Sequence, residues 1–355
     1  MSSVPFSKLL LGWYDPTLRP MPWKEERDPY RIWISEVILH QTRVAQGWNY
    51  YLRFLEKFPD LQSLAAATPE AVLQIWQGLG YYRRALHLHQ AARQIAEEYD
   101  GKIPSTSTEL IKIKGIGAYT AAALASFAWR EPIAAVDGNV YRILSRVFCE
   151  EANIDTVQGR KVFTQLAGEL LDKKQPHLFN QAMMDLGATI CTPRKPACIE
   201  CPLNQTCCAF GLDAQSKYPI RNKKKEKSNV YLYYLVCRKE NLVWLHKRSE
   251  SGIYRDMYEF YLVAEETQDT NPDMFSRIRQ DIKPDLITLP QPQYSQHLLT
   301  HRKLHISIYE INAPFSSERL SFGRFYTIAE ALKLPTPIFI FQYLTALLSQ
   351  SKADK

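Results

Sequence analysis

Four cysteines gather in one short stretch of the 355-residue chain. They are Cys191, Cys198, Cys201 and Cys207, separated by six, two and five residues. In a chain that we expect to be cytoplasmic, such a cluster indicates a metal site rather than a set of disulfides. Four thiolates suit a tetrahedral zinc ion, and four thiolates also hold a cubane iron–sulfur cluster. The spacing alone leaves both metal centres open.

The other three cysteines carry less information. Cys208 follows Cys207 directly, and we expect it to be a spare thiol. Cys149 and Cys237 are expected to be ordinary small residues of the core. Prolines between the four clustered cysteines keep that segment in a loop, so that the thiolates are free to converge.

Two carboxyl groups are candidates for acid–base chemistry. Glu36 lies in a helical pattern, and its neighbours one turn away are largely apolar. A carboxyl in such surroundings resists ionisation and suits a general acid, although a partly exposed glutamate at the helix edge is the simpler interpretation. Asp137 precedes another helical pattern, where an N-cap explains it equally well. We expect the capping bonds to keep it ionised, as stabilising a developing cation requires.

A Gly-x-Gly turn, formed by Gly115 and Gly117, joins two helical patterns. Glycine permits a positive φ and the close approach of another backbone. The amides of the turn and of the following helix can then bind a phosphate, which is how a helix-hairpin-helix motif contacts DNA. An ordinary helix C-cap is the alternative.

The net charge of +7 is concentrated in one segment. Residues 216–229 contain six basic side chains and one acidic side chain, whereas the flanking parts are each close to neutral. A basic surplus is typical of nucleic-acid binding, but a solvated linker explains this segment more simply. The composition excludes a disordered chain, a collagen and a coiled coil, and no apolar run is long enough to span a membrane.

The elements that must position these groups change in character near residue 213. Helical patterns precede it, including one that begins after Asp28, one over 119–129 and one after Asp137. Beyond the basic segment, four runs rich in β-branched and aromatic residues predict strands, and 338–348 predicts a closing helix. The predicted strands are Val230–Cys237, Leu242–His246, Glu259–Ala264 and His305–Ile311.

Several short motifs occur along the chain in an order that is typical of one protein family. They are Pro22-Trp23, Ser35-Glu36-Val37 with Gln41-Thr42, Gly78-Leu79-Gly80-Tyr81-Tyr82, Gly115-Ile116-Gly117, Val136-Asp137-Gly138-Asn139-Val140 and the four cysteines. Together they resemble adenine DNA glycosylases of the MutY type, within the helix-hairpin-helix superfamily. The resemblance covers residues 6–212 strongly and 230–350 more weakly.

The resemblance implies a multidomain fold of the α and α+β classes. Residues 1–212 would form an all-α helix-hairpin-helix glycosylase domain, with a six-helix module at about 28–134 and an iron–sulfur module of 1–27 plus 135–212. Residues 213–229 would be a basic interdomain linker, and 230–350 a C-terminal Nudix-like α/β domain. The four cysteines would hold a 4Fe-4S cluster, which decides against zinc.

The resemblance also implies catalytic roles. Glu36 would protonate the adenine and then activate water, and Asp137 would stabilise the sugar cation. Tyr119 and Asn139 would position these carboxyls and the leaving base. Relatives that also cut the strand have a Schiff-base lysine where this chain has Tyr119, and a tyrosine cannot do that chemistry. We therefore expect a monofunctional glycosylase.

Further residues match the family's binding positions. The C-terminal part lacks the paired-glutamate run of Nudix hydrolases, so we expect a reader of 8-oxoguanine rather than a hydrolase. Leu299 and Thr300 depart from the phenylalanine and serine common at this loop, although Thr300 keeps the hydroxyl. The matching positions are Trp23, Lys24, Val44, Gln181 and Met184 for the adenine pocket, Gln41, Tyr81, Gly115, Gly117, Arg194 and Lys195 for DNA, and Thr300 and His301 for 8-oxoguanine.

The implied activity is removal of adenine opposite 8-oxoguanine or guanine in double-stranded DNA, during base excision repair. We expect a monomer that is cytoplasmic in a bacterium, associated with the nucleoid and not with a membrane. A pyrimidine-directed glycosylase on the same scaffold is disfavoured by the reader domain and by Tyr119. A non-catalytic DNA-binding protein with an iron–sulfur cluster is disfavoured by the presence of both Glu36 and Asp137.

Overall fold

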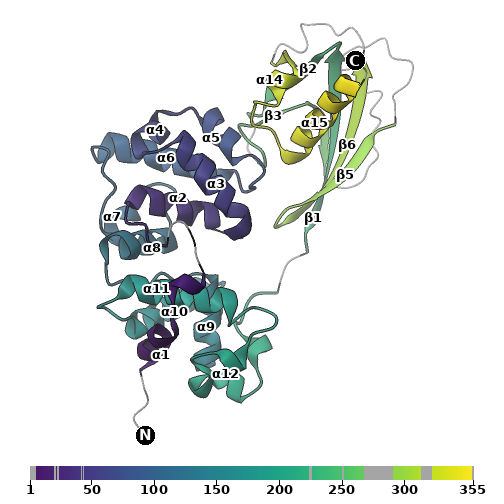
Figure 1. Ribbon diagram of the computed structural model, residues 1–355. Coiled ribbons are helices and arrows are strands. Elements are labelled where there is room, and N and C mark those ends of the chain that lie inside the picture. Colours follow the sequence, from purple (N-terminus) through teal and green to yellow (C-terminus); the bar gives the residue numbers. More distant parts are fainter. Residues whose placement is uncertain are drawn as a thin grey trace. The chain divides into compact units, whose positions relative to one another are not determined.

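The computed structural model describes residues 5–19, 21, 24–40, 42, 44–223, 226–249, 252–267, 291–312 and 322–353. The chain divides into two compact units, whose elements are labelled in Figure 1. The first unit comprises Met1–Ala66 and Leu86–Lys223, and the second comprises Ala67–Ala85 and Lys224–Lys355. The second unit therefore includes a helical segment from the N-terminal half of the sequence.

Helices build the first unit, as the helical periodicity before residue 213 predicts. Helix α5 (Pro69–Trp76) belongs to the second unit, and α6 (Arg83–Glu98) begins there and continues in the first. Short 3-10 turns occur at Pro16–Leu18, Cys198–Glu200, Asn204–Thr206 and Gln215–Lys217. The α-helices of the first unit are α1 (Phe6–Trp13), α2 (Pro29–Leu39), α3 (Val44–Lys57), α4 (Leu61–Ala66), α7 (Ser107–Leu110), α8 (Ala118–Trp129), α9 (Gly138–Phe148), α10 (Val157–Leu170), α11 (Pro176–Thr189) and α12 (Cys208–Gly211).

Side-chain caps fix where two of these helices begin. The Asp28 carboxylate accepts from the backbone N–H of Tyr30, with a proline in the first turn of α2. The Thr106 hydroxyl accepts from the N–H of Glu109 at the start of α7, whose own carboxylate bonds a lysine instead of returning to the cap. The helix start predicted after Asp28 is confirmed, and Thr106 marks the start of α7 in the same way, because a short polar side chain satisfies an N–H that the helix leaves unpaired.

One apolar core joins the helices that follow residue 137. Val140 and Leu144 of α9, Phe163 of α10 and Leu186 of α11 are buried in it together with α1 residues. Three of the clustered cysteines pack against the same core. The cysteine loop and the helix that begins after Asp137 thus share one packing environment.

The second unit contains a seven-stranded mixed sheet of order β3-β2-β1-β6-β5, in which β4 also pairs with β1 and β7 with β2. Strands β1 and β6 are parallel, and the other pairs are antiparallel. All four predicted strand regions are confirmed, whereas the sequence does not predict β5 and β7. Strand β5 is almost wholly exposed, so it lacks the apolar residues that signal a strand. The bounds are β1 (Ser228–Lys239), β2 (Leu242–Lys247), β3 (Tyr258–Glu259), β4 (Tyr261–Glu266), β5 (Gln293–Leu298), β6 (Arg302–Asn312) and β7 (Arg324–Thr327).

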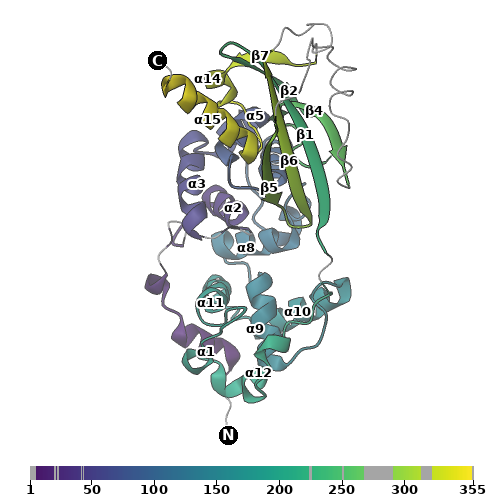
Figure 2. The same cartoon turned by 90° about the vertical axis from the view of Figure 1, so that its right-hand side faces the viewer.

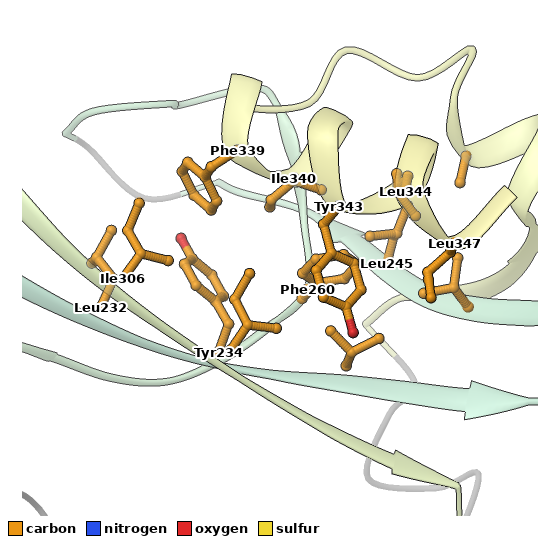
Figure 3. Close-up of a cluster of buried hydrophobic side chains, with 14 of the residues drawn as sticks. Leu232, Tyr234, Leu245, Phe260, Ile306, Phe339, Ile340, Tyr343, Leu344 and Leu347 are labelled. Carbon is orange, nitrogen blue, oxygen red and sulfur yellow. The ribbon is translucent and has the colours of Figure 1, made fainter. Parts of the chain in front are cut away.

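Helices α14 (Ile328–Ala331) and α15 (Ile338–Ala353) follow the last strand, and α15 lies along one face of the sheet (Figure 2). The close-up in Figure 3 shows side chains of α15 facing side chains that rise from the strands. Ile340 and Leu344 of α15 and Tyr234, Leu245 and Phe260 below them are fully buried. This interface confirms the predicted closing helix and forms the main core of the second unit.

Residues 67–85 make specific contacts with the C-terminal part of the chain. The Gln77 side-chain amide donates to the Thr336 hydroxyl at 2.9 Å, and Glu70 forms an ion pair with Lys247. The ring of Tyr82 meets the ring of Tyr254 edge-on. The division into units therefore does not follow chain order, and the domain boundaries given above stay a prediction.

The first part of the predicted linker packs on the first unit. The Ile154 N–H donates to the Ile220 carbonyl at 3.2 Å, and the Asn222 N–H donates to the Asp155 carboxylate at 3.0 Å. Ile220 and Asn222 are thus held by hydrogen bonds that a polar composition does not reveal. Within the described ranges, no helix is both long enough and apolar enough to cross a membrane.

Candidate active site and iron–sulfur loop

Glu36 of α2 and Tyr119 of α8 meet through a short hydrogen bond. The Tyr119 hydroxyl donates to Oε2 of Glu36 at 2.7 Å. Burial, together with the nearby negative charges of Glu36 and Asp137, raises the pKa of Tyr119 well above its ordinary value, so the phenol keeps its proton and remains a donor. Both side chains keep limited access to solvent, as groups that meet a substrate must.

The environment of Glu36 favours its protonated form. Burial raises the pKa of Glu36 to about 7, the Tyr119 hydrogen bond opposes that rise, and the charge of Asp137 adds to it. The prediction that this carboxyl resists ionisation is confirmed, as is its place on a largely apolar side of the helix. A carboxyl with a pKa near neutrality can both give and accept a proton at neutral pH.

Asp137 caps helix α9, and its capping bonds are extensive. One carboxylate oxygen accepts from the backbone N–H groups of Asn139 at 2.8 Å and Val140 at 2.9 Å, and the other accepts from the Asn139 side chain at 2.8 Å. The predicted cap is confirmed. Burial opposes these bonds and raises the pKa of Asp137, so the expectation that capping keeps it ionised stays a prediction.

Arg142 fastens this end of α9 to the cysteine loop, a role that the sequence analysis missed. Its guanidinium donates to the side-chain carbonyl of Asn139 at 2.7 Å, to the Gly187 carbonyl at 2.7 Å and to the Cys191 carbonyl at 2.7 Å. The available signal is its position, one turn after Asn139 on the same helix face. Arg142 thereby links the carboxyl of Asp137, through Asn139, to the first cysteine of the loop.

Only part of the predicted adenine pocket comes together around Glu36. The Met184 sulfur of α11 lies 3.8 Å from the Tyr119 hydroxyl, so Met184 borders the acid pair. Val44 begins α3 and stays a prediction. Trp23 of the pocket and Gln41 of the DNA contact set lie outside the described residues.

Lys24 is committed to other partners. Its ammonium donates to Asp185 Oδ2 at 2.7 Å and to the backbone carbonyls of Pro16 at 3.0 Å and Arg19 at 3.1 Å. Gln181 also donates to Asp185, at 3.4 Å. With three acceptors for three N–H groups, the Lys24 ammonium has no donor left for a base in this conformation. The sequence analysis missed Asp185, a buried acid of α11 that accepts hydrogen bonds from both side chains.

The four clustered cysteines line one cavity. The Arg146 guanidinium donates to the Cys191 sulfur at 3.4 Å, and the Gln215 amide donates to the Cys198 sulfur at 3.8 Å. Yet within the described chain, no three His, Cys, Asp or Glu side chains are gathered closely enough to hold one metal ion. Four thiols around one cavity are a ligand set that fits an iron–sulfur cluster and also fits zinc, so this geometry by itself does not choose between them.

Cys149 and Cys208 form a disulfide across a sequence separation of 59. The predictions of a spare thiol at Cys208 and a plain core residue at Cys149 are therefore wrong. The reason lies in the tertiary structure, because α9 ends beside the last cysteine of the loop and places the two Cα atoms 5.7 Å apart. Cys237 is a buried free thiol, as expected.

The Gly-x-Gly turn has a clear structural reason for its first glycine. Gly115 has a φ of 95°, and a Cβ there would stand 2.8 Å from the Cβ of His87. Gly117 is the N-cap of α8 and has open space around it. The first N–H groups of α8 follow this turn directly, and their contact with a phosphate stays a prediction. Arg194 and Lys195 are exposed on the cysteine loop, and their DNA contacts stay predictions.

The predicted 8-oxoguanine reader and the Gly-Tyr-Tyr loop come together in the second unit. Thr300 and His301 occupy the turn between β5 and β6, and the Tyr81 hydroxyl is in hydrogen-bond contact with that of Thr300. Tyr81 has a φ of 51° and is 49% exposed. The Lys227 ammonium braces the turn by donating to the Leu299 carbonyl at 2.7 Å. Two predicted contact residues, 219 positions apart, thus form one exposed tip.

Comparison with known families agrees with these arrangements. Residues 34–168 match the HhH-GPD superfamily of base excision DNA repair proteins, and residues 232–346 match the NUDIX domain. Residues 191–207 match the iron–sulfur binding domain of endonuclease III, and this match spans the four cysteines. The predicted fold class is confirmed, and so is the 4Fe-4S cluster as the cofactor of the loop.

Individual relatives share one name. The adenine DNA glycosylase of Buchnera aphidicola from Schizaphis graminum is 34% identical over 326 residues, which cover 89% of this chain and 90% of that protein. The mouse and Arabidopsis thaliana adenine DNA glycosylases are 44% and 35% identical, over 58% and 71% of this chain. The matches span 42% and 46% of those two proteins, so the chain corresponds to less than half of each.

Among solved structures, that of a thermostable thymine-DNA glycosylase is similar to this chain, with a TM-score of 0.54 and 28% identity. The similarity covers 58% of this chain and 95% of that structure.

The close crossing of α9 and α11 provides a first test of the site. A Cβ on Gly187 would stand 2.4 Å from the Cβ of Asn139, whereas one on Gly168 of α10 would meet nothing within 4 Å. We expect Gly187→Ala to lower the free energy of unfolding by about 2 kcal/mol. Gly168→Ala, which carries the same change into a helix, should leave it unchanged or raise it by up to about 1 kcal/mol. Urea denaturation measures both, and equal stabilities would contradict the crossing described.

The raised pKa of Glu36 predicts a pH-dependent cost in stability. Between the ordinary pKa of 4.5 and about 7, the folded protein binds more protons than the unfolded chain, so the free energy of unfolding falls as the pH rises. Glu36→Gln removes that cost. We expect it to exceed the wild type by about 1 kcal/mol at pH 8, after allowing for partial exposure, and to match it at pH 4. Exposed Glu56→Gln should show no such trend, and a less stable Glu36→Gln at pH 8 would refute the assignment.

Proposed function

Because this chain belongs to the adenine DNA glycosylases of the HhH-GPD superfamily, we propose that it removes adenine from duplex DNA where adenine stands opposite 8-oxoguanine or guanine. The observation that carries the proposal is the Glu36 carboxyl, held at 2.7 Å by a protonated Tyr119 with the charge of Asp137 nearby. Two carboxyl groups with different environments are what cleavage of a glycosidic bond through an oxocarbenium-like state requires.

The reaction begins with the target base outside the stack. Flipping the nucleotide costs about a few kcal/mol, and the flipped adenine then meets Glu36. With a pKa of about 7, a large share of Glu36 carries a proton at neutral pH. It donates this proton to the adenine ring, which weakens the bond from the base to the sugar. The resulting carboxylate then takes a proton from the attacking water, and Glu36 returns to its starting state.

Asp137 acts on the positive charge that develops on the sugar. As the bond to adenine breaks, positive charge develops on the sugar, and an ionised Asp137 stabilises it, either by charge alone or through a transient covalent adduct. The Asn139 side chain and two backbone N–H groups fix the orientation of the carboxylate. Since burial raises the pKa of Asp137, these bonds are needed to keep enough of it ionised.

Tyr119 supports a purely hydrolytic mechanism. A phenol has no amino group with which to form the Schiff base that strand cleavage of this kind requires. The hydroxyl instead stabilises the carboxylate of Glu36 after proton transfer, and the bordering Met184 offers an apolar wall to the base. The expected product is an abasic site in an intact strand.

The opposite base is read in the second unit. The contact between Tyr81 and Thr300 supports a role for this tip, since it exposes an aromatic ring beside hydroxyl and imidazole groups. The ring suits insertion into a base stack, and Thr300 and His301 suit hydrogen bonds to the edge of 8-oxoguanine. Phosphate contacts then come from the amides after Gly117 and from Arg194 and Lys195 on the cluster loop.

A single-turnover assay tests the activity. We expect cleavage after alkali for duplexes with adenine opposite 8-oxoguanine or guanine, none before alkali, and none for thymine opposite guanine. Glu36→Gln should reduce the rate by at least about 100-fold while still binding the mismatch, and exposed Glu56→Gln should not. The wild-type rate should fall as the pH rises through about 7, since Glu36 then loses its proton. Excision of thymine, or an active Glu36→Gln, would refute the proposal.

The reader is tested by removing one hydroxyl at a time. Thr300→Ala should reduce the preference for 8-oxoguanine over guanine by about tenfold, the scale of one hydrogen bond, whereas Thr300→Ser should keep it. Tyr81→Phe retains the ring and should lose less mismatch affinity than Tyr81→Ala. The excision rate is measured on both duplexes. Mismatch affinity is measured as a dissociation constant after each substitution has been combined with Glu36→Gln, which prevents excision during the measurement. An unchanged preference in Thr300→Ala would exclude Thr300 from recognition.

A further inference from the structure

The Cys149–Cys208 disulfide stands where the cluster loop ends. Cys208 directly follows Cys207, the last of the four cysteines that hold the cluster. Cys149 is the C-cap of α9, and it is held in a left-handed conformation with a φ of 50°. The bond therefore ties the residue after the last cluster ligand to the end of the helix that begins at Asp137.

Helix α9 holds the two ends of the loop by different means. At the first ligand, the Arg142 guanidinium donates to the Cys191 carbonyl, and the Arg146 guanidinium donates to the Cys191 sulfur and to the Thr192 carbonyl. At the last ligand, the Cys207 sulfur lies 3.5 Å from the Arg146 carbonyl. Charged hydrogen bonds thus secure the start of the loop, and a weak sulfur contact accompanies the disulfide at its end.

We propose that Cys149 and Cys208 are a redox modification site whose disulfide locks the end of the loop onto α9 and slows release of the 4Fe-4S cluster. Both residues keep partial access to solvent, so small thiols and disulfides can reach them. Opening the bond removes the covalent tie between this end of the loop and α9 and leaves non-covalent contacts, namely the Cys207 sulfur contact and apolar packing. The last ligand then moves more freely, and the cluster is lost sooner.

The chemistry is thiol–disulfide exchange with a low-molecular-weight disulfide of the glutathione class. In the forward direction, the two protein thiols form the Cys149–Cys208 bond, and the reagent's S–S bond breaks to give two thiols. Two electrons and two protons pass from the protein to the reagent. Excess small thiol reverses each step. The four cluster ligands take no part in this exchange.

The first experiment establishes the oxidation state of the pair. The holoprotein is denatured in an alkylating reagent without reductant, and the labels are counted by intact mass. Of seven cysteines, five are free in the structure, so five labels are expected, and seven after prior reduction. Peptide mapping must locate the two labels that appear only after reduction at Cys149 and Cys208. Seven labels in protein treated with glutathione disulfide would overturn the proposal.

The second experiment follows the visible absorbance of the cluster while an iron chelator competes for it. We expect the reduced wild type to lose its cluster about tenfold faster than the oxidised form. Tenfold is the low end of the effect of removing a residue that supports the metal ligands without binding the metal itself. The double variant Cys149→Ser/Cys208→Ser should lose its cluster at the fast rate with or without thiol. Cys237→Ala removes a free thiol in β1 and should behave as wild type.

Both outcomes are decisive and independent of adenine excision. If the double variant does not fold, reduced wild type still provides the comparison. Equal loss rates for the two forms of the wild type would overturn the lock, and so would a thiol effect that persists in the double variant. Since neither readout measures base removal, a failure here is distinct from a failure of the glycosylase assignment.

Discussion

Helix α9 carries the constraint on which the described sites of the first unit depend. It begins at the Asp137 cap, crosses α11 where there is no room for a Cβ at Gly187, and ends at Cys149. Arg142 and Arg146 lie between these ends and donate hydrogen bonds to the cysteine loop. A shift of α9 along its axis would therefore displace the carboxyl at one end and the cluster loop along its length. Close packing makes such a shift costly, because the crossing has no spare volume to absorb it.

The two candidate carboxyls, Glu36 and Asp137, are both buried but differ in their hydrogen bonds. Glu36 has one hydrogen-bond donor, Tyr119, so burial dominates and its pKa rises to about 7. Asp137 accepts three hydrogen bonds, which oppose the same effect of burial. The number of donors aimed at each carboxyl thus distinguishes two groups that are both buried, as the roles proposed for them require. Each carboxyl also raises the cost of ionising the other, which favours a single charge at the site.

The two units divide the chain according to contacts rather than sequence order. Residues 67–85 belong by sequence to the helical half, yet Gln77, Tyr82 and Glu70 contact the C-terminal part. This segment ends in the loop that carries Tyr81, and the Tyr81 hydroxyl meets Thr300. This aromatic residue and the turn between β5 and β6 therefore belong to the same unit. Neither polarity nor periodicity marks such a boundary, since α5 is an ordinary amphipathic helix on both counts.

The sequence by itself determined the local features of this protein. Short polar caps placed the starts of α2 and α9, alternating β-branched runs placed four strand regions, and cysteine spacing located the metal loop, because each of these signals acts over a few residues. Tertiary structure alone decided the rest. Asp185 forms an ion pair with Lys24, and Cys149 forms a disulfide with Cys208. Arg142 connects the Asp137 end of α9 to the cluster loop. These partners lie 49 to 161 residues apart in the sequence, and only the packing of the helices brings them together. Burial, which raises the pKa of Glu36, likewise exists only in the folded chain.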